Sequence, residues 1–433
     1  MQISNKTFTI VTLGCRINIC ESNSIASQLT KRGAKWMNDI DNANICIVNT
    51  CCVTNKAESK SRYFINRAIR SKKCELVIIV GCLVQLSKKI DDNNKIGIVL
   101  GSKSKNDIGK WIDQYKDSQR IMVVDSFTKR DVFDEYDDDN SENNTRAFIK
   151  IQDGCDFMCS YCVIPFVRGR QRSLSHKIIL EKVKRLIHNG YKEVILTGVN
   201  TAGYRESNIY GFYDLLQDIN KLKGDFRVRI SSLEPFQISK QIIDLIIDNK
   251  KRWCSQFHIC IQSANDTTIK LMKRKYTLKQ FMELCAYIRK RNKLVSITTD
   301  YIVGFPTETS EQFNDSLKNL EQIKFSDMHI FPFSSRPFTV ASKLKNVVSD
   351  YEKKTRFIAI DKLNKQTQSN YLKQFIGVVV NVLFEHSNKP GVQTGHSEYF
   401  FTVNIKTIKV FTNQMLSVKI TSLVGDQLFG TLV

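Results

Sequence analysis

The stretch Phe148-Ile-Lys-Ile-Gln-Asp-Gly-Cys155-Asp-Phe-Met-Cys159-Ser-Tyr-Cys162 sets three cysteines in a C-x3-C-x2-C spacing directly behind an apolar run. The run predicts a strand, and the glycine before Cys155 predicts a turn. Thiolates at this density bind zinc or an iron–sulfur cluster. Structural zinc sites are closed by four ligands, and this stretch offers no local fourth cysteine. The spacing therefore favours a cluster with one open iron, able to hold a substrate molecule directly, over a zinc knuckle.

Downstream of this motif, short apolar runs alternate with amphipathic helical patterns such as Leu180–His188 and Leu278–Arg291. These strand–helix units predict a partial (β/α)6 TIM-like barrel over residues 147–376, with its chemistry at the carboxyl ends of the strands. From about Gly377 strand follows strand without a helix, which predicts a small β-barrel over residues 377–433. The predicted barrel strands are Phe148–Gln152, Val194–Thr197, Val228–Ser231, His258–Gln262, Ile297–Val303 and Met328–Phe333.

Residues 1–125 alternate in the same way and predict an open α/β sheet domain. Helical patterns over Glu21–Arg32 and Ala57–Ser71 separate some of its strands. The acidic run Asp131–Asn144 lacks apolar periodicity, so residues 126–146 are predicted to form a solvated linker. The predicted N-terminal strands are Phe8–Leu13, Ile45–Asn49, Leu76–Val80 and Ile96–Leu100.

Three further cysteines, Cys15, Cys51 and Cys82, each follow a predicted strand of this N-terminal sheet. Ligand sites in open α/β sheets gather at the carboxyl ends of the strands, so these thiols can meet at one edge. Cys52 stands beside Cys51 and is the alternative at that position. The chain holds 13 cysteines and no export signal, so we expect its thiols to be reduced. The remaining cysteines have no ligand-like spacing and are predicted to be small buried hydrophobes: Cys20, Cys46, Cys74, Cys254, Cys260 and Cys285.

Composition points to a soluble protein with an anionic partner. Hydrophobic residues make up 42% of the 433 residues, and no apolar run reaches the length of a membrane helix. The N-terminus lacks the features of a signal peptide, so we expect a cytoplasmic protein without a membrane partner. The net charge of +22, from 65 Lys and Arg against 43 Asp and Glu, favours nucleic acid. An AT-rich genome, which enriches Lys, Asn and Ile, is the alternative explanation of this charge.

The cysteine motif at the end of a first barrel strand resembles that of the radical S-adenosylmethionine superfamily. The resemblance implies that Cys155, Cys159 and Cys162 hold a [4Fe–4S] cluster whose open iron chelates S-adenosylmethionine. It further implies reductive cleavage of this cofactor to a 5′-deoxyadenosyl radical, which removes hydrogen from unreactive C–H bonds. In such an enzyme the protein supplies placement and the cofactor supplies the chemistry.

With three N-terminal segments, the motif resembles the methylthiotransferase family over essentially the whole chain. The resemblance implies an N-terminal three-cysteine domain, a radical barrel and a C-terminal TRAM domain. It also implies a second [4Fe–4S] cluster on Cys15, Cys51 and Cys82, with Cys51 rather than Cys52 in the family's Asn-Thr-Cys position. The open iron of this cluster would carry the transferred sulfur group, which calls for a sulfur source and an electron donor protein. The segments are Thr12-Leu-Gly-Cys15-Arg-Ile-Asn18, Asn49-Thr-Cys51-Cys-Val-Thr54 and Val80-Gly-Cys82-Leu-Val-Gln85.

Other positions match the family at successive strand ends and in the loop after the motif. Turn chemistry is the alternative reading of the strand ends, and a solvated loop is the alternative for the arginines. The positions expected to bind the cofactor are Gly198, Ser232, Glu234, Gln262 and Gly304. The arginines of this loop could pair phosphates or carboxylates through both terminal nitrogens, and those expected to bind RNA phosphates are Arg168, Arg170 and Arg172.

Three segments resemble the branch that acts on N6-threonylcarbamoyladenosine at position 37 of tRNA, beside the anticodon. The implied reaction methylates sulfur on the N-terminal cluster from one S-adenosylmethionine. A second S-adenosylmethionine supplies the radical that removes hydrogen from C2 of the adenine, where the methylthio group is added. A base in an anticodon loop can be reached without melting a duplex. The segments are Lys150-Ile-Gln-Asp153-Gly-Cys155, Val53-Thr-Asn-Lys56-Ala and Ser231-Ser-Leu-Glu-Pro235.

Three other functions stay open at this point. A methylthiotransferase of this kind could act on N6-isopentenyladenosine at position 37 of tRNA or on an aspartate of a ribosomal protein. A protein without enzymatic activity could use the cysteines to bind structural zinc and the basic surface to bind RNA.

Overall fold

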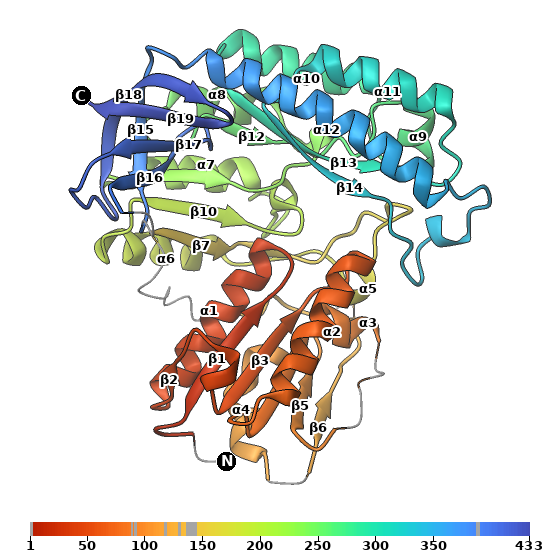
Figure 1. Ribbon diagram of the computed structural model, residues 1–433, viewed down its shortest axis with the longest axis vertical. Helices are drawn as coiled ribbons and strands as arrows, with labels where there is room; N and C mark the ends of the chain where they lie inside the picture. The colour runs from red at the N-terminus through yellow and green to blue at the C-terminus, as the bar shows by residue number, and fades with distance from the viewer. Residues whose placement is uncertain are drawn as a thin grey trace. The chain divides into compact units, whose positions relative to one another are not determined.

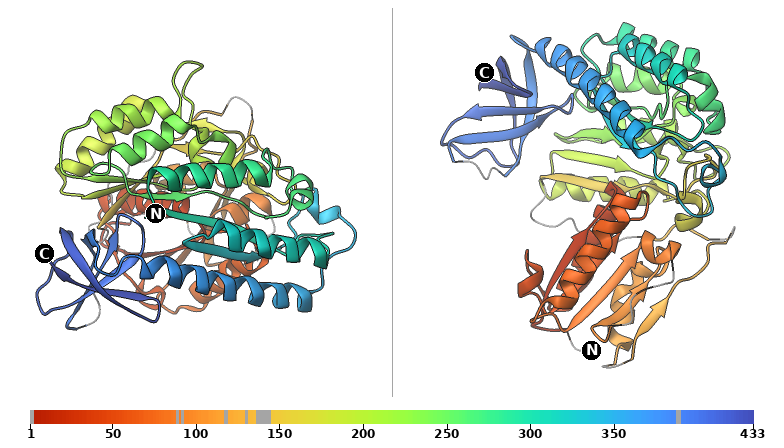
Figure 2. Two further views of the ribbon diagram at one scale, coloured as in Figure 1. Left: turned by 90° about the horizontal axis from the view of Figure 1, so that it is seen from above. Right: turned by 45° about the vertical axis from the view of Figure 1, so that its right-hand side comes forward.

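The computed structural model describes residues 3–87, 90, 93–116, 119–128, 131–135, 145–386 and 390–433. Contacts divide the chain into two compact units, each described below by itself (Figures 1 and 2). The first unit comprises 1–144, 148–174 and 334–342, and the second comprises 145–147, 175–333 and 343–433. Most of the predicted acidic linker, residues 136–144, lies outside the described residues. Among the described residues, no helix combines the length and apolar character that crossing a bilayer requires.

The first unit is built on a parallel sheet with strand order β2-β1-β3-β4-β5-β6. Strands β3, β4 and β5 are buried along their whole length, as expected where helices cover both faces of a parallel sheet. The strands are β1 (Thr7–Thr12), β2 (Lys35–Trp36), β3 (Ile45–Thr50), β4 (Leu76–Gly81), β5 (Ile96–Leu100) and β6 (Ile121–Val123). The open α/β sheet predicted for this part of the chain is confirmed.

Helices on the two faces of this sheet bury separate apolar clusters. Ile25 and Leu29 of α1 and Ile112 of α4 pack on one face, whereas Ile65 and Ala68 of α2 pack on the other. The helices are α1 (Arg16–Lys31), α2 (Asn55–Arg70), α3 (Cys82–Leu86) and α4 (Ile108–Gln114). The sheet is therefore held rigidly from both sides, with its carboxyl edge left for the turns that follow the strands.

Two segments from later in the sequence complete the first unit. In the first segment, β8 (Gln152–Asp153) pairs antiparallel with β9 (Arg172–Ser173). The residues between these strands include the three motif cysteines and the short helix α5 (Ile164–Arg168). The second segment, 334–342, carries Ser334, whose Oγ accepts a hydrogen bond from the backbone N–H of Asn55 at 2.9 Å.

The second unit contains the alternating strands and helices of the predicted partial barrel, which is confirmed. Its strands lie in the orders β11-β10-β7 and β12-β13-β14, and isolated parallel bridges such as Leu233 to Ile259 join the two groups. Figure 1 shows α10, α11 and α12 beside β12, β13 and β14. The strands are β7 (Arg146–Lys150), of which residues 148–150 are counted with the first unit, β10 (Glu193–Thr197), β11 (Arg227–Ile230), β12 (Gln256–His258), β13 (Ser296–Val303) and β14 (Asp327–Pro332). The helices are α6 (His176–His188), α7 (Phe212–Lys221), α8 (Lys240–Asp248), α9 (Asp266–Leu271), α10 (Leu278–Arg291), α11 (Ser310–Ile323) and α12 (Asp350–Lys373).

One predicted strand ends earlier than expected. The apolar run from His258 predicted a strand as far as Gln262, but β12 ends at His258. Gln262 has a φ of 60°, in the left-handed region, which no strand residue adopts. Its backbone instead forms an isolated parallel bridge with Tyr301 of β13, since its N–H donates to the Asp300 carbonyl and its own carbonyl accepts from the N–H of Ile302, both at 2.9 Å.

The chain ends in a closed barrel with strand order β15-β16-β17-β19-β18, as the run of strands after Gly377 predicted. Phe375, which follows α12, is fully buried among the apolar side chains of this barrel. The strands are β15 (Val379–Phe384), β16 (Val392–Ser397), β17 (Thr402–Lys406), β18 (Met415–Val424) and β19 (Gln427–Leu432).

A buried ion-pair group fastens this barrel to the α/β part of the same unit. The Glu193 carboxylate accepts from Nε of Arg227 at 2.6 Å and from Nε of Arg229 at 2.8 Å. The two arginines also donate to backbone carbonyls of β15 and β16, including that of Ser397 at 2.9 Å. Burial raises the pKa of Glu193, but Arg229 and Arg227 outweigh it and hold that pKa well below its usual range.

We predict that Glu193→Gln destabilises the protein by about 3 kcal/mol, because it leaves two buried guanidinium groups without their carboxylate. Chemical denaturation would measure this, with the exposed Glu283→Gln as a control expected to change little. The native pair stabilises the fold above the ordinary glutamate pKa of 4.5 and loses this contribution as the pH falls through the lowered value. The variant should therefore lose less stability on acidification, and equal acid sensitivity of the two proteins would contradict the assignment.

Candidate functional site

The cysteines of the N-terminal sheet lie at the carboxyl ends of three neighbouring strands. Cys15 follows β1 and caps α1, Cys51 follows β3, and Cys82 follows β4 as the first residue of α3. Because β1, β3 and β4 are adjacent and parallel, these positions share one edge of the sheet. A Cβ on Gly14 would lie 2.8 Å from the Cys51 sulfur, so the turn before Cys15 touches Cys51 directly. We call Cys15, Cys51 and Cys82 the N-terminal cysteine set.

The buried Asn18 side chain braces the turns that carry two of these cysteines. Its Nδ2 donates to the carbonyl of Leu13 at 2.6 Å and to that of Thr50 at 3.1 Å. Its Oδ1 lies 3.9 Å from the Cys15 sulfur. One amide therefore ties the backbone before Cys15 to the backbone before Cys51, which fixes the spacing of the two turns.

Cys52 lies next to Cys82 and competes with Cys51 for a role in this site. Cys52 is fully buried and packs in one apolar cluster with Cys82. The Cys52 thiol lowers the pKa of Cys82 to about 5, with burial opposing this and Arg168 adding to it. A thiolate at Cys82 is the form that binds metal. The prediction that Cys51 rather than Cys52 is the ligand stays a prediction.

The motif cysteines stand in a loop whose backbone is shaped by Gly154. Its φ is +69°, and a Cβ there would lie 2.0 Å from the carbonyl oxygen of Arg170. The next residue, Cys155, donates its N–H to the Gly169 carbonyl at 3.1 Å. The N–H of Phe157 points at the Cys155 sulfur at 3.4 Å, an interaction that stabilises a thiolate. All three motif sulfurs belong to part-exposed residues, so a group bound there can be reached.

The two cysteine sets belong to the same compact unit and are joined by packing. Val163, directly after the motif, and Val167 of α5 pack against Cys52 and Cys82. On another side, the Ser160 carbonyl accepts from the N–H of Ala341 at 2.7 Å. No sequence pattern predicts that these loops pack together, because the contacts join chain segments that are far apart in sequence.

Arg336 makes a second connection that sequence reasoning missed. Its Nη1 donates to the carbonyl of Cys52 at 3.1 Å and to the Glu58 carboxylate at 3.0 Å. Burial raises the pKa of Glu58, but hydrogen bonds from Arg336 and Arg62 lower it overall. Segment 334–342 therefore contacts both the turn after Cys51 and the motif loop.

The three loop arginines fall into two groups. Arg168 is 1% exposed and Arg172 is 8% exposed, and both pair with the buried Asp153. Their guanidinium groups face the protein interior, so the expectation that they bind RNA phosphates is wrong. Arg170 is exposed and is the member of the trio that a nucleic acid can reach.

Arg168 also pairs with Glu21 of α1, with Nη1 to Oε1 at 3.0 Å. Burial raises the pKa of Glu21, but Arg168, Lys105 and Lys150 outweigh it and hold that pKa at about 2. The Glu21 carboxylate is therefore ionised at neutral pH, although it is fully buried. Nothing in the spacing of Glu21 marked it as part of the site.

In the second unit, the positions expected to bind the cofactor lie at or just beyond strand ends, as predicted. Gly198 follows β10, and Ser232 and Glu234 follow β11. The Glu234 carboxylate is held by both terminal nitrogens of Arg274, with Oε1 to Nη1 at 3.1 Å. Arg274 also donates to the Cys260 carbonyl at 3.0 Å. The ion pair with Arg274 therefore explains the position of Glu234 without a cofactor.

Contacts within the protein also explain why position 304, at the end of β13, is a glycine. Its φ is +70°, and a Cβ there would lie 2.5 Å from Cγ of Lys353 in α12. Its N–H donates to the Glu308 carboxylate at 3.3 Å. The close approach predicted at Gly304 is therefore made by a side chain of α12. Its role toward a cofactor, like those of Gly198, Ser232 and Gln262, stays a prediction.

A group of two histidines and one aspartate, which sequence reasoning did not single out, stands on β12, β13 and β14. The Asp300 Oδ1 lies 3.3 Å from Nε2 of His258 and 3.2 Å from Nδ1 of His329. Thr298 orients His258 through a 2.9 Å contact with its Nδ1. Burial raises the pKa of Asp300, but hydrogen bonds from His258 and His329 hold it well below its usual range. Such a group can share a proton among its members or present one to a bound molecule.

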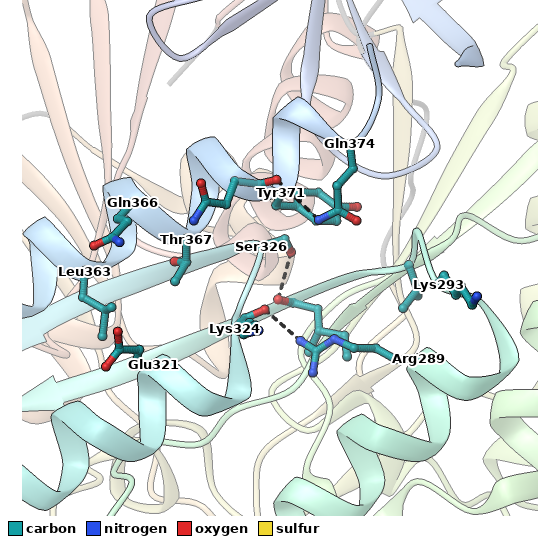
Figure 3. Close-up of a pocket in the computed structure, with 13 residues that line it drawn as sticks. Arg289, Lys293, Glu321, Lys324, Ser326, Leu363, Gln366, Thr367, Tyr371 and Gln374 are labelled. Carbon is teal, nitrogen blue, oxygen red and sulfur yellow. Dashed lines mark hydrogen bonds between the residues drawn. The ribbon is translucent and has the colours of Figure 1, made fainter. Parts of the chain in front are cut away.

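Figure 3 shows a pocket of about 380 Å³ elsewhere in the second unit. It lies at the amino ends of β13 and β14 and is lined by the ends of α10 and α11 and by α12. Arg289 spans it to donate to the Lys324 carbonyl at 2.8 Å. With Lys293 and Lys324 also in the lining, the pocket is basic. It lies at the opposite ends of these strands from Gly304, so it is not the site described above.

Comparisons with known proteins agree with this arrangement of the chain. Residues 149–320 match the family model described as the radical SAM superfamily. Residues 7–101 match a second model, described as uncharacterized protein family UPF0004. The first match covers the motif cysteines and most of the partial barrel, and the second covers the N-terminal cysteine set.

Several relatives align over nearly the whole chain. A threonylcarbamoyladenosine tRNA methylthiotransferase, MtaB, of Bacillus subtilis is 33% identical over 96% of this chain and 93% of its own length. That of Thermotoga maritima is 37% identical over 91% of this chain and 90% of its own. A tRNA-2-methylthio-N(6)-dimethylallyladenosine synthase of Acetivibrio thermocellus is 30% identical over 99% of this chain and 91% of its own.

Solved structures share the fold at low sequence identity. The radical S-adenosylmethionine methyltransferase TsrM of Kitasatospora setae superposes with a TM-score of 0.54 at 13% identity, covering 90% of this chain and 80% of that one. The cobalamin-dependent S-adenosylmethionine radical enzyme OxsB also gives a TM-score of 0.54, at 11% identity, covering 86% of this chain and 56% of that one. These likenesses support the α/β architecture.

We predict that Gly154→Ala destabilises the protein by more than about 2 kcal/mol, because a side chain there meets both a left-handed backbone and the Arg170 carbonyl. Gly425→Ala is a matched control: its φ is +64°, but a Cβ there would meet nothing within 4 Å. The control should lose only about 1 kcal/mol from backbone conformation. Thermal unfolding of both variants measures the difference, and equal losses would show that the motif loop tolerates the clash.

Proposed function

This chain belongs to the radical SAM tRNA methylthiotransferase family, and we propose that it adds a methylthio group to C2 of N6-threonylcarbamoyladenosine at position 37 of tRNA. The observation that carries the proposal is the presence of two separate three-cysteine sets in one compact unit. The threonylcarbamoyl substrate is supported by the relatives of that name at 33% and 37% identity. The relative that acts on dimethylallyladenosine is nearly as similar, at 30%, so that substrate is the second candidate.

The family brings an iron–sulfur cluster and S-adenosylmethionine, and the residues of the motif loop fit such a cluster. Three part-exposed thiols stand within eight residues, and the Phe157 N–H already points at one sulfur. When bound, the cluster and S-adenosylmethionine supply radical chemistry that removes hydrogen from an unreactive carbon. The chain's part is to hold the sulfurs at Cys155, Cys159 and Cys162, with Gly154 shaping the turn before them.

We infer a second [4Fe–4S] cluster on the N-terminal cysteine set. Support comes from the strand-end geometry and the Asn18 brace, which together place three thiols at one edge of the sheet. The low pKa of Cys82 favours its thiolate, whereas burial raises the pKa of Cys15 and of Cys51. Sulfur incorporation at this edge calls for a sulfur source, and reduction of a cluster calls for an electron donor protein. Both partners belong to the proposal and are not identified by the chain's own residues.

Binding of the tRNA anticodon loop is supported by charge. The chain carries a net charge of +22, so phosphates should be attracted and binding should weaken as salt is raised. The exposed Arg170, on the loop that follows the motif, is the residue we expect to contact RNA. A base in a loop can be presented with its edge exposed, which suits a reaction at C2 of adenine.

We predict about eight irons per chain after anaerobic reconstitution, because two cubane clusters hold four each. Replacing either cysteine set by alanine should halve the count, since the other set keeps its own cluster. Cys285→Ala is the control and should leave the count unchanged, because this thiol lies on the buried face of α10 and is far in sequence from both sets. Cys51→Ala and Cys52→Ala, tested separately, identify the ligand of the pair. A full iron count after loss of the N-terminal set would refute the second cluster.

Mass spectrometry of tRNA nucleosides from a strain lacking this protein tests the substrate. The methylthio derivative of N6-threonylcarbamoyladenosine should disappear while the unmethylthiolated nucleoside accumulates. The native gene should restore it, and a gene encoding Cys159→Ala should not. Loss of the methylthio derivative of isopentenyladenosine instead would establish the second candidate, and an unchanged set of nucleosides would refute both.

A further inference from the structure

Arg168 is the last residue of α5, the short helix that follows the motif cysteines, and it is buried in the first unit. Its guanidinium group forms a bidentate ion pair with Glu21, with Nη1 to Oε1 at 3.0 Å and Nη2 to Oε2 at 3.2 Å. The same Nη1 reaches Asp153 at 3.2 Å. These bonds from both terminal nitrogens depend on the rigid, planar guanidinium group, which lysine lacks.

Asn18 connects this guanidinium to the N-terminal cysteine set. Nη2 of Arg168 donates to the Asn18 Oδ1 at 2.7 Å, and that same oxygen lies 3.9 Å from the Cys15 sulfur. Because Arg168 occupies the oxygen, the amide nitrogen is turned toward the carbonyls of Leu13 and Thr50, which it binds. Arg168 thus fixes the orientation of the side chain that braces the turns of Cys15 and Cys51.

Helix α5 also contacts the third cysteine of this set through apolar side chains. Val163 and Val167 pack with Cys82 in one buried cluster. Val163 directly follows Cys162 in the sequence, and Arg168 directly follows Val167. A single short segment therefore begins at the last motif cysteine and touches the N-terminal cysteine set by both polar and apolar contacts.

The polar side of this contact is a buried group of cations and carboxylates. Within the described part of the chain, the buried cations Arg168, Lys105, Lys150 and Arg172 gather around the buried carboxylates of Glu21 and Asp153. The half-buried Asp134 also lies near Lys150 and Arg172. Arg168 is the cation of this group that reaches the Asn18 oxygen beside Cys15, so its charge favours an anion at the N-terminal cysteine set. Cysteine thiolates that hold an iron–sulfur cluster supply negative charge of this kind.

We propose that Arg168 is a positioning residue that locks the motif loop to the N-terminal cysteine set and places a buried positive charge behind the cluster held there. The proposal rests on the proposed function, because it assumes a cluster on that set. It assigns Arg168 a role within the protein in place of the RNA contact that its sequence context suggested. The planar guanidinium group of Arg168 holds the two cysteine sets at a fixed distance from each other. Its positive charge affects the redox potential of the N-terminal cluster.

A redox titration of the full-length chain tests the role of the charge. Alanine at Cys155, Cys159 and Cys162 leaves the N-terminal cluster as the source of the signal, and its midpoint potential is followed by electron paramagnetic resonance. Adding Arg168→Gln should shift the potential to more negative values, because a buried positive charge that favours the reduced cluster is removed. Adding Arg168→Lys should shift it less, and the control Arg70→Gln, an exposed residue at the end of α2, should not shift it. An unshifted potential in Arg168→Gln at equal iron content would overturn this role.

The positioning role is tested in the chain with all its cysteines. The readout is the ratio of methylthiolated tRNA to 5′-deoxyadenosine formed. Both Arg168→Gln and Arg168→Lys should lower this ratio roughly tenfold or more, because the two sets lose their fixed spacing while cofactor cleavage persists. Arg70→Gln should match the native chain. If Arg168→Gln fails to fold, the same ratio is measured in Arg168→Lys and Asn18→Ser. An unchanged ratio in both variants would refute the positioning role.

Failure of this inference is distinguishable from failure of the proposed function. If the native chain forms no methylthiolated tRNA of any kind, the proposed function is wrong, whereas the redox titration still reports on Arg168. If the native chain is active and the Arg168 variants behave like it in both assays, the proposed function stands and the role of Arg168 is refuted.

Discussion

Parallel pairing of β1, β3 and β4 is the constraint on which the N-terminal cysteine set depends. Parallel neighbours in register end at the same edge of a sheet, so the residues that follow one strand lie near those that follow the next. An antiparallel neighbour would deliver its following residue to the opposite edge. Cysteines that are distant in sequence therefore meet without a dedicated loop, and helices on both faces make this edge rigid.

Buried arginines then connect parts that the sheets alone would leave separate. In the first unit, Arg168 and Arg336 reach carboxylates and carbonyls on helices and turns near the cysteines. In the second unit, Arg227 and Arg229 join the α/β strands to the closed barrel through Glu193 and backbone carbonyls. A guanidinium offers five donors in a fixed plane, so it can satisfy several acceptors from different segments at once. The cost of burying its charge is offset where carboxylates face it closely.

Residues at the strand ends of the second unit show how packing and chemistry share the same positions. Glu234 is matched to Arg274, and Gly304 is required by the approach of Lys353. These contacts shape the ends of β11 and β13 whether or not a cofactor is bound. His258, Asp300 and His329 form a further polar group in this unit, in which two imidazoles contact one carboxylate oxygen.

The sequence by itself determined the type and order of the elements and the positions of the candidate ligands. Continuous apolar runs predicted β3, β4 and β5, the C-x3-C-x2-C spacing predicted the motif loop, and strands without helices predicted the closed barrel after Gly377. Apolar periodicity is a local property, and so is ligand spacing within a loop. The prediction from apolar periodicity was wrong at Gln262, where a sequence predicted to be a strand contains a residue with left-handed backbone angles.

Only the tertiary structure decided what the charged residues do. From the sequence we expected Arg168 to bind RNA phosphates, because neither Glu21 nor Asn18 is near it along the chain. Folding brings these side chains within hydrogen-bond distance and removes them from water. The same holds for Arg336 and the Cys52 carbonyl. A charged side chain carries no local signal of its partner, since that partner is chosen by the packing of segments that the sequence keeps apart.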